Sequence, residues 1–97
     1  MPLTARQRQR ARALAHHLAP TVTIGRGGAS ALVVAKAEEE LDHHELIKVK
    51  IFADDRTSLL ALADELAAKA EADLVQVIGK IAVMYRRRAK EPEVDLG

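Results

Sequence analysis

Apolar residues recur at every third or fourth position in three segments of the chain, the spacing typical of amphipathic helices. The first predicted helix covers about residues 4–17 and begins with Thr4 and Gln7, which have the spacing of a capping box. The second covers about residues 30–43, with Ser30 suited to an N-cap. The third runs to about residue 72, and either Asp54 or Asp55 is expected to be its N-cap. The apolar side of each helix is expected to be buried.

Apolar and polar residues alternate in the segment "ELIKVKIF", which predicts a β-strand. Ile47, Val49 and Ile51 are expected to face the core, whereas Lys48 and Lys50 are expected to face solvent on the opposite side. The shorter runs "TVTI", "LVQVI" and "IAVMYR" are also predicted strands. Gly79-Lys80, between the last two runs, predicts a hairpin turn.

The predicted order of elements is α-β-α-β-α-β-β, which indicates an α/β fold with the two-layer character of α+β proteins. The βαβ steps favour parallel pairing and the terminal hairpin adds an antiparallel strand, so a small four-stranded mixed sheet is expected. A chain of 97 residues suits one domain, which we predict over residues 1–88. Residues 89–97 are polar and are predicted to form a flexible tail.

The segment Gly25-Arg26-Gly27-Gly28 lies between a predicted strand and a predicted helix. Glycines at a helix N-terminus allow a phosphate to approach the backbone amides, and Arg26 adds a charged donor. A tight turn that requires positive φ angles also favours glycine, so the pattern leaves both interpretations open. The motifs GxxxxGK[ST] and GxGxxG are absent, so we do not expect the loop to bind a nucleoside triphosphate.

The net charge of +1 conceals a strong segregation of charge along the chain. Twelve of the 15 basic residues lie in three segments without acidic residues: residues 1–28, the "LIKVKIF" strand and residues 80–90. The acidic residues gather in the second and third predicted helices and in the tail. A basic face formed in this way would attract polyanions.

Several classes of function find no support in the sequence. The chain has no cysteine, no apolar run long enough for a membrane span and no apolar N-terminal segment, so a cytoplasmic protein without membrane partners is expected. The pairs His16-His17 and His43-His44 are adjacent and do not share a helix face, so no metal site is predicted. No spacing of residues suggests a nucleophile, a cofactor or a small-molecule substrate, and we expect no enzyme activity.

Phe52 and Tyr85 are the only aromatic residues of the chain. Modules that bind single-stranded RNA by base stacking use several exposed rings. If this protein binds RNA, the sequence therefore predicts recognition mainly through phosphates and helix shape.

The segments "IGRGG", "LDHHELIKVKI" and "VQVIGKIAVMYR" together resemble the CRM domain, the chloroplast RNA splicing and ribosome maturation domain. The resemblance extends from Leu3 to about Arg88, and the chain has about the length of the stand-alone bacterial form, the YhbY-type protein. The "HHELIKVK" motif is the most specific part of it. The family implies the order of elements given above, in a fold similar to the C-terminal domain of bacterial initiation factor three.

The resemblance also implies that the protein binds ribosomal RNA in precursors of the large subunit during ribosome assembly. Separately, we expect a monomer. The family's GxxG loop, similar in local chemistry to that of KH domains, is implied to contact RNA and maps to Gly25, Arg26, Gly27 and Gly28. The family's basic surface maps to Lys48, Lys50, Lys80 and Arg86. From the basic segments we add further candidates for RNA contact: Arg87, Arg88, Arg6 and Arg10.

An alternative function is that of a protein-interaction adaptor, which would use the acidic faces of the second and third helices. Binding of RNA should weaken steeply as salt rises, whereas docking through an apolar surface should not.

Overall fold

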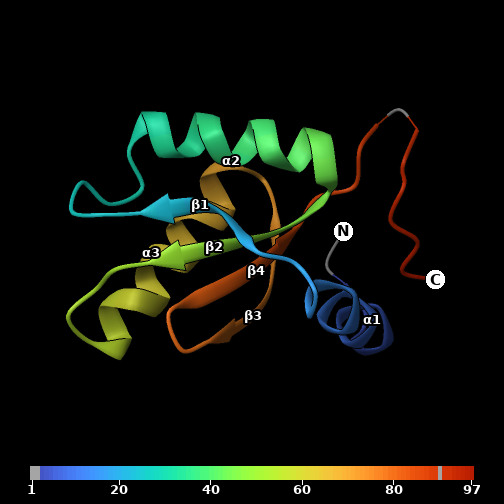
Figure 1. The fold of residues 1–97 in the computed structure, drawn as a ribbon, viewed down its shortest axis with the longest axis horizontal. Coiled ribbons are helices and arrows are strands. Elements are labelled where there is room, and N and C mark those ends of the chain that lie inside the picture. Colours follow the sequence, from blue (N-terminus) through green and yellow to red (C-terminus); the bar gives the residue numbers. More distant parts are fainter. Residues whose placement is uncertain (1–2, 90) are drawn as a thin grey trace.

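The computed structural model describes residues 3–89 and 91–97 and confirms the predicted order of elements (Figure 1). The helices and strands are α1 (Ala5–Ala15), β1 (Pro20–Ile24), α2 (Ala31–His44), β2 (Leu46–Ile51), α3 (Arg56–Lys69), β3 (Asp73–Ile78) and β4 (Ile81–Tyr85). Lys90, counted above in the third basic segment, lies outside the described residues.

Each helix begins at the cap that the sequence predicted. Thr4 and Gln7 form the capping box of α1, in which the hydroxyl of Thr4 accepts the Gln7 amide at 3.1 Å and the Gln7 side chain accepts the Thr4 amide at 3.0 Å. Ser30 caps α2 and Asp55 caps α3, the latter by accepting the amide of Ser58 at 2.7 Å. These side chains satisfy amides that have no partner within their own helix.

The sheet has the strand order β1-β2-β4-β3, with the last strand of the chain in its interior. β1 and β2 are parallel, as the first βαβ step predicted, and β4 is antiparallel to both β2 and β3. β3 therefore runs in the same direction as β2 but is separated from it by β4. The four-stranded mixed sheet expected from the sequence is confirmed.

The first core lies between one face of the sheet and the helices α2 and α3. Ile47, Val49 and Ile51 of β2 are buried in it, as the alternation of the strand predicted. Ala37 and Leu41 of α2 are completely buried against them. The third helix contributes a row at helical spacing: Leu59, Ala63, Leu66 and Ala67.

Helix α1 covers part of the opposite sheet face and forms a partial third layer (Figure 1). Ala11 and Ala15 pack with Leu46, the first residue of β2, in a second core. Along this face of β2 the side chains change from buried Leu46, through half-buried Lys48, to exposed Lys50. The prediction that this whole face is exposed to solvent was therefore right only for its far half, because α1 packs on the near half.

The last residues of the chain pack against α1 and the second core. Leu96 is buried and Val94 contacts the same cluster, while the side-chain amide of Gln7 donates to the carbonyl oxygen of Gly97 at 3.1 Å. The polar composition of residues 89–97 predicted a flexible tail. In the structure Leu96 and Val94 place residues 91–97 in contact with the domain.

Glu45 joins the end of α2 to this C-terminal segment. The residue is completely buried and has a φ angle of 62° as the C-cap of α2. Its carboxylate accepts the backbone amides of Arg88 and Val94, each at 2.8 Å, and that of Glu93. Burial alone would raise the pKa of Glu45, but the three amides and the charge of Arg88 outweigh it, so the pKa lies below its ordinary value.

Candidate nucleic-acid interface

The loop Gly25–Gly28 forms a tight turn between β1 and α2. The amide of Gly28 donates to the carbonyl oxygen of Gly25 at 3.0 Å, and the amide of Ser30 donates to that of Gly28 at 2.9 Å. Gly28 has a φ angle of 68°, which favours glycine, whereas Gly27 has no positive φ. A Cβ at Gly25 or Gly27 would meet no atom within 4 Å, so neither crowding nor backbone conformation requires glycine at these two positions.

The loop leads directly into the N-terminus of α2. The Ser30 hydroxyl accepts the amide of Val33 at 3.4 Å, and the first turn of the helix contains no acidic residue. Leu32 in this turn is 84% exposed. The amides at the start of α2 carry partial positive charge, which suits an anion bound beside the glycine loop.

Two backbone hydrogen bonds bring this loop and the β3–β4 turn to the same end of the sheet. The amide of Phe52 donates to the carbonyl oxygen of Ile24 at 3.0 Å, and the amide of Ile51 donates to that of Lys80 at 2.8 Å. The residue after β2 thus lies beside the start of the glycine loop, with Lys80 at its other side. We call the loop Gly25–Gly28 together with Lys50, Phe52 and Lys80 the basic edge.

Two lysines of the basic edge surround its aromatic ring. The Nζ atoms of Lys50 and Lys80 lie 5.1 and 5.8 Å from the centroid of Phe52, which is 49% exposed. The nearby acid Asp55 is occupied as the cap of α3, and the hydrogen bond that it accepts from Ser58 lowers the pKa of Asp55. The edge therefore offers two ammonium groups and an aromatic surface next to an open backbone loop.

Lys48 lies farther along β2, where α1 meets the sheet. Its side chain lines a pocket of about 200 Å³ together with Arg12 and His16 of α1 and Gln76 of β3. Arg12 and His16 were not among the residues predicted from the sequence to contact RNA. Their signal was the spacing of four residues, which places both on the same side of α1.

Three consecutive arginines follow β4, and two of them are held inside the fold. The guanidinium of Arg86 donates to the carbonyl oxygen of Ala70 at 2.7 Å and pairs with the Asp42 carboxylate at 2.7 Å. Arg88 donates to the carbonyl oxygens of α2's last turn and pairs with Glu93 at 3.2 Å. These contacts give both residues a structural role, whereas Arg87 is exposed.

The arginines of α1 differ in the same way. Arg8 donates to the carbonyl oxygens of Leu74 and Val75 at 2.6 and 2.9 Å and so ties α1 to β3. Arg6 and Arg10 are exposed, as a phosphate contact requires. Arg10, however, lines a shallow depression beside the acidic residues of the C-terminal segment rather than the basic edge.

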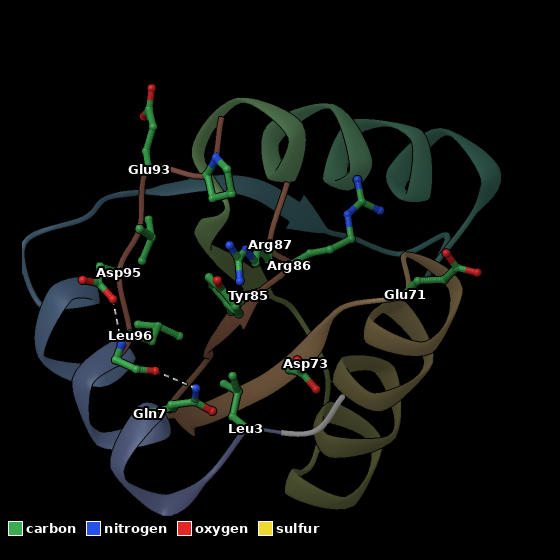
Figure 2. Close-up of a pocket in the computed structure, with 13 residues that line it drawn as sticks. Leu3, Gln7, Glu71, Asp73, Tyr85, Arg86, Arg87, Glu93, Asp95 and Leu96 are labelled. Atoms are coloured by element: carbon green, nitrogen blue, oxygen red, sulfur yellow. Dashed lines mark hydrogen bonds between the residues drawn. The ribbon is translucent and has the colours of Figure 1, made fainter. Parts of the chain in front are cut away.

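A larger pocket of about 650 Å³ lies beneath the C-terminal segment (Figure 2). Figure 2 shows the bond from Gln7 to Gly97 at its margin. Acidic side chains outnumber basic ones in its lining, which includes Glu71, Asp73, Glu93 and Asp95 against Arg86 and Arg87. This charge makes the pocket unsuitable for a polyanion.

Within residues 3–89 and 91–97, no group of three or more potential ligand residues could hold a metal ion. Over the same described ranges, none of the helices combines the length and apolar character that a membrane span requires.

The architecture defines a class: small α/β proteins with a four-stranded mixed sheet, two helices on one face and a glycine-rich turn before the second helix. The model of the CRS1 / YhbY (CRM) domain matches residues 3–86, and the chain belongs to this family. The resemblance seen in the sequence is thereby confirmed.

Relatives and a solved structure agree with this assignment. The chain is 42% identical over 90 residues to "Probable RNA-binding protein PA4753" of Pseudomonas aeruginosa, with 93% of this chain and 86% of the relative covered. It is 42% identical over 84 residues to an "RNA-binding protein" of Haemophilus influenzae, with 87% and 85% covered. The solution structure of a Staphylococcus aureus protein matches with a TM-score of 0.80 at 35% identity, covering 96% of this chain and 99% of that one.

Proposed function

We propose that this protein is a non-catalytic RNA-binding protein that binds ribosomal RNA in large-subunit precursors during ribosome assembly. The observation that carries the proposal is the convergence of the glycine loop, Lys50 and Lys80 at one end of the sheet. The names of two relatives and the family membership support RNA as the ligand class. The family resemblance supports the ribosomal target. We further propose that the protein acts in the cytoplasm as a monomer, without a cofactor or small-molecule substrate.

The RNA backbone is the part that the basic edge would contact first. Phosphate oxygens can approach the open backbone at Gly25 and Gly27, and Arg26 is exposed beside them. The pairing of a lysine with an exposed ring contributes only about 0.5–1 kcal/mol, whereas a hydrogen bond to a charged group contributes about 1.5–3 kcal/mol. Lys50 and Lys80 would therefore leave Phe52 for a phosphate when RNA binds.

The proposed contact residues are the glycine loop and cationic side chains that form no ion pair within residues 3–89 and 91–97. They comprise the loop Gly25–Gly28 and the side chains of Lys48, Lys50, Lys80 and Arg87, with Arg6 and Arg10 of α1 as peripheral contacts. Arg86 and Arg88 support the surface from inside the fold, because their guanidinium groups are bonded to α2 and to the end of α3.

The test is the affinity for a structured fragment of large-subunit ribosomal RNA, measured over a range of salt concentrations. The variants Lys50→Gln and Lys80→Gln should each bind more weakly, and each lost phosphate contact should reduce the slope of log K against log salt by roughly 0.7–0.9. Lys36→Gln is the matched control, because Lys36 lies on α2 and pairs with Glu40 at 3.0 Å.

Equal effects of the three lysine substitutions would contradict a specific role for the basic edge. Attachment to precursor particles without affinity for the isolated RNA would favour the adaptor function of the acidic helix faces instead.

A further inference from the structure

Half of the second sheet face has no helix over it. α1 packs where Leu46 of β2 and Val83 of β4 lie, and its contact ends near Lys48. In the next row across the sheet, Lys50 of β2 stands opposite Ile81 of β4, which stands opposite Ile78 of β3. Ile78 is 61% exposed, so a large apolar side chain is open on this half of the face.

A pocket of about 200 Å³ lies at the boundary between the covered and uncovered halves. Its apolar side chains are those of Ala15, Ile78, Ile81 and Val83, and its polar ones are those of Arg12, His16, Lys48 and Gln76. No acidic residue lines it. The volume is below the roughly 300 Å³ at which sites for drug-sized ligands begin, so it suits one flat ring system rather than a complete cofactor.

The chemistry of this pocket fits one kind of ring. Isoleucine and valine offer an apolar surface to the faces of a ring, and the amide of Gln76 can both donate to and accept from its polar edge. Among residues 3–89 and 91–97 the Gln76 side chain has no hydrogen-bond partner. Arg12 and Lys48 supply positive charge at the rim, where phosphates attached to the ring system would lie.

The pocket is also continuous with the basic edge. Lys48 lines the pocket, and Lys50, two residues farther on the same face of β2, belongs to the edge. Ile81 of the pocket stands opposite Lys50 in the sheet register. RNA whose backbone lies on the edge therefore passes the mouth of the pocket.

We propose that this pocket receives one unpaired base of the bound RNA, such as a bulged nucleotide extruded from a helix. The inference rests on the proposed function and deepens it, because it adds recognition of a base to contact with the backbone. A paired base is stacked inside its helix and cannot enter, so the pocket distinguishes RNA with an unpaired nucleotide from a continuous duplex.

The experiment uses three versions of one RNA hairpin: fully paired, with one bulged nucleotide, and with an abasic residue in place of that nucleotide. The protein should bind the bulged hairpin roughly 5- to 150-fold more tightly than the other two, the range expected for contacts to one base. Gln76→Ala and Ile78→Ser should abolish most of this preference, and thermal unfolding should confirm that both variants fold.

Two further variants separate the inference from the proposed function. Lys50→Gln should weaken binding of all three hairpins by a similar factor, because it removes a backbone contact. Leu60→Ser is the matched control for Ile78→Ser, since Leu60 is an exposed apolar residue on α3, and it should change nothing.

Equal affinity for the bulged and abasic hairpins would overturn the pocket as a base site while leaving RNA binding intact. Failure to bind any of the three would overturn the proposed function, and the base site with it.

Discussion

The carboxylate of Glu45 accepts the backbone amide of Arg88 at 2.8 Å, and the carbonyl oxygen of Glu45 accepts the amide of Arg86 at 2.8 Å. Glu45, the residue after α2, therefore binds the chain that leaves β4 at two points. Its carbonyl oxygen binds Arg86 and its side chain binds Arg88. With the amides of Glu93 and Val94 added, one buried side chain fixes the path of the C-terminal segment.

We expect Glu45→Gln to lower the free energy of unfolding by about 2–3 kcal/mol, because hydrogen bonds to a charged group are lost and an amide group faces backbone donors. This corresponds to a decrease in melting temperature of roughly 10–20 °C for a domain of this size. Glu93→Gln is the control, since the Glu93 side chain is 72% exposed and contributes one surface ion pair. Equal melting temperatures for the two variants would contradict the role of Glu45.

The same carboxylate predicts a dependence of stability on pH. The pKa of Glu45 in the folded protein is lowered from 4.5. Burial raises this pKa, but the three backbone amides and the charge of Arg88 together lower it by more than burial raises it. Its contribution is complete above the unfolded pKa and is lost as pH falls through the lower folded pKa. Denaturant titrations should show a large stability difference between wild type and Glu45→Gln at pH 7 that shrinks below about pH 4. If the stability difference between wild type and Glu45→Gln stays constant with pH, the ionised carboxylate of Glu45 is not its cause.

Glu71 offers a stabilising substitution at the end of α3. It is exposed and has a φ angle of 55°. The left-handed conformation costs a residue with a side chain about 1–2 kcal/mol, and glycine loses about 0.5–1 kcal/mol in chain entropy on folding. Glu71→Gly should therefore stabilise the protein by about 0.5–1 kcal/mol. Glu45→Gly has the same backbone change but should destabilise, because the buried carboxylate is lost, and calorimetry on both variants checks the contrast.

Two neighbouring arginines should respond differently to truncation. Arg86→Ala removes bonds to Ala70 and Asp42 and should destabilise the domain by about 2–3 kcal/mol. Arg87 is exposed, so Arg87→Ala should change stability by less than about 0.5 kcal/mol while weakening RNA binding. Urea titration together with RNA binding distinguishes the two, and an unchanged stability of Arg86→Ala would show that its bonds contribute nothing.

Alanine variants of Gly27 and Gly28 distinguish the role of the loop in backbone conformation from its role in ligand contact. Gly28→Ala should destabilise by about 1 kcal/mol or more, because the φ angle of 68° strains any side chain. Gly27→Ala should preserve or slightly raise stability, since the added Cβ meets no atom within 4 Å. If phosphate approaches this backbone, Gly27→Ala should still weaken RNA binding. Normal RNA affinity of the folded Gly27→Ala variant would mean that the loop serves only as a turn.

The order of elements, the caps and the core of β2 could be predicted because each follows from a local pattern. The capping box joins Thr4 to Gln7, only three residues apart, and the alternating residues Ile47, Val49 and Ile51 are two residues apart. The position of β4 between β2 and β3 could not, because it depends on pairing between distant segments, as between Leu46 and Tyr85.

The candidate site was predictable to a similar extent. The loop Gly25–Gly28 and the lysines of β2 follow from the glycine pattern and the alternation of charge. The internal roles of Arg86 and Arg88 could not be predicted, since their partners lie about 45 residues earlier in the chain. A single glutamate before a strand gives no sign of burial, so Glu45 and the packing of the C-terminal segment were also missed.

The interior position of β4 has a consequence for how the protein is made. A ribosome produces β4 after every other strand, yet β3 pairs with no strand except β4 and β2 needs β4 on its second edge. Until Tyr85 has emerged, the nascent chain can assemble only the parallel pair β1–β2, and β3 has nothing to pair with. The sheet is therefore completed late in synthesis, when β4 pairs with β2 of the middle third of the chain and with β3 of the last third.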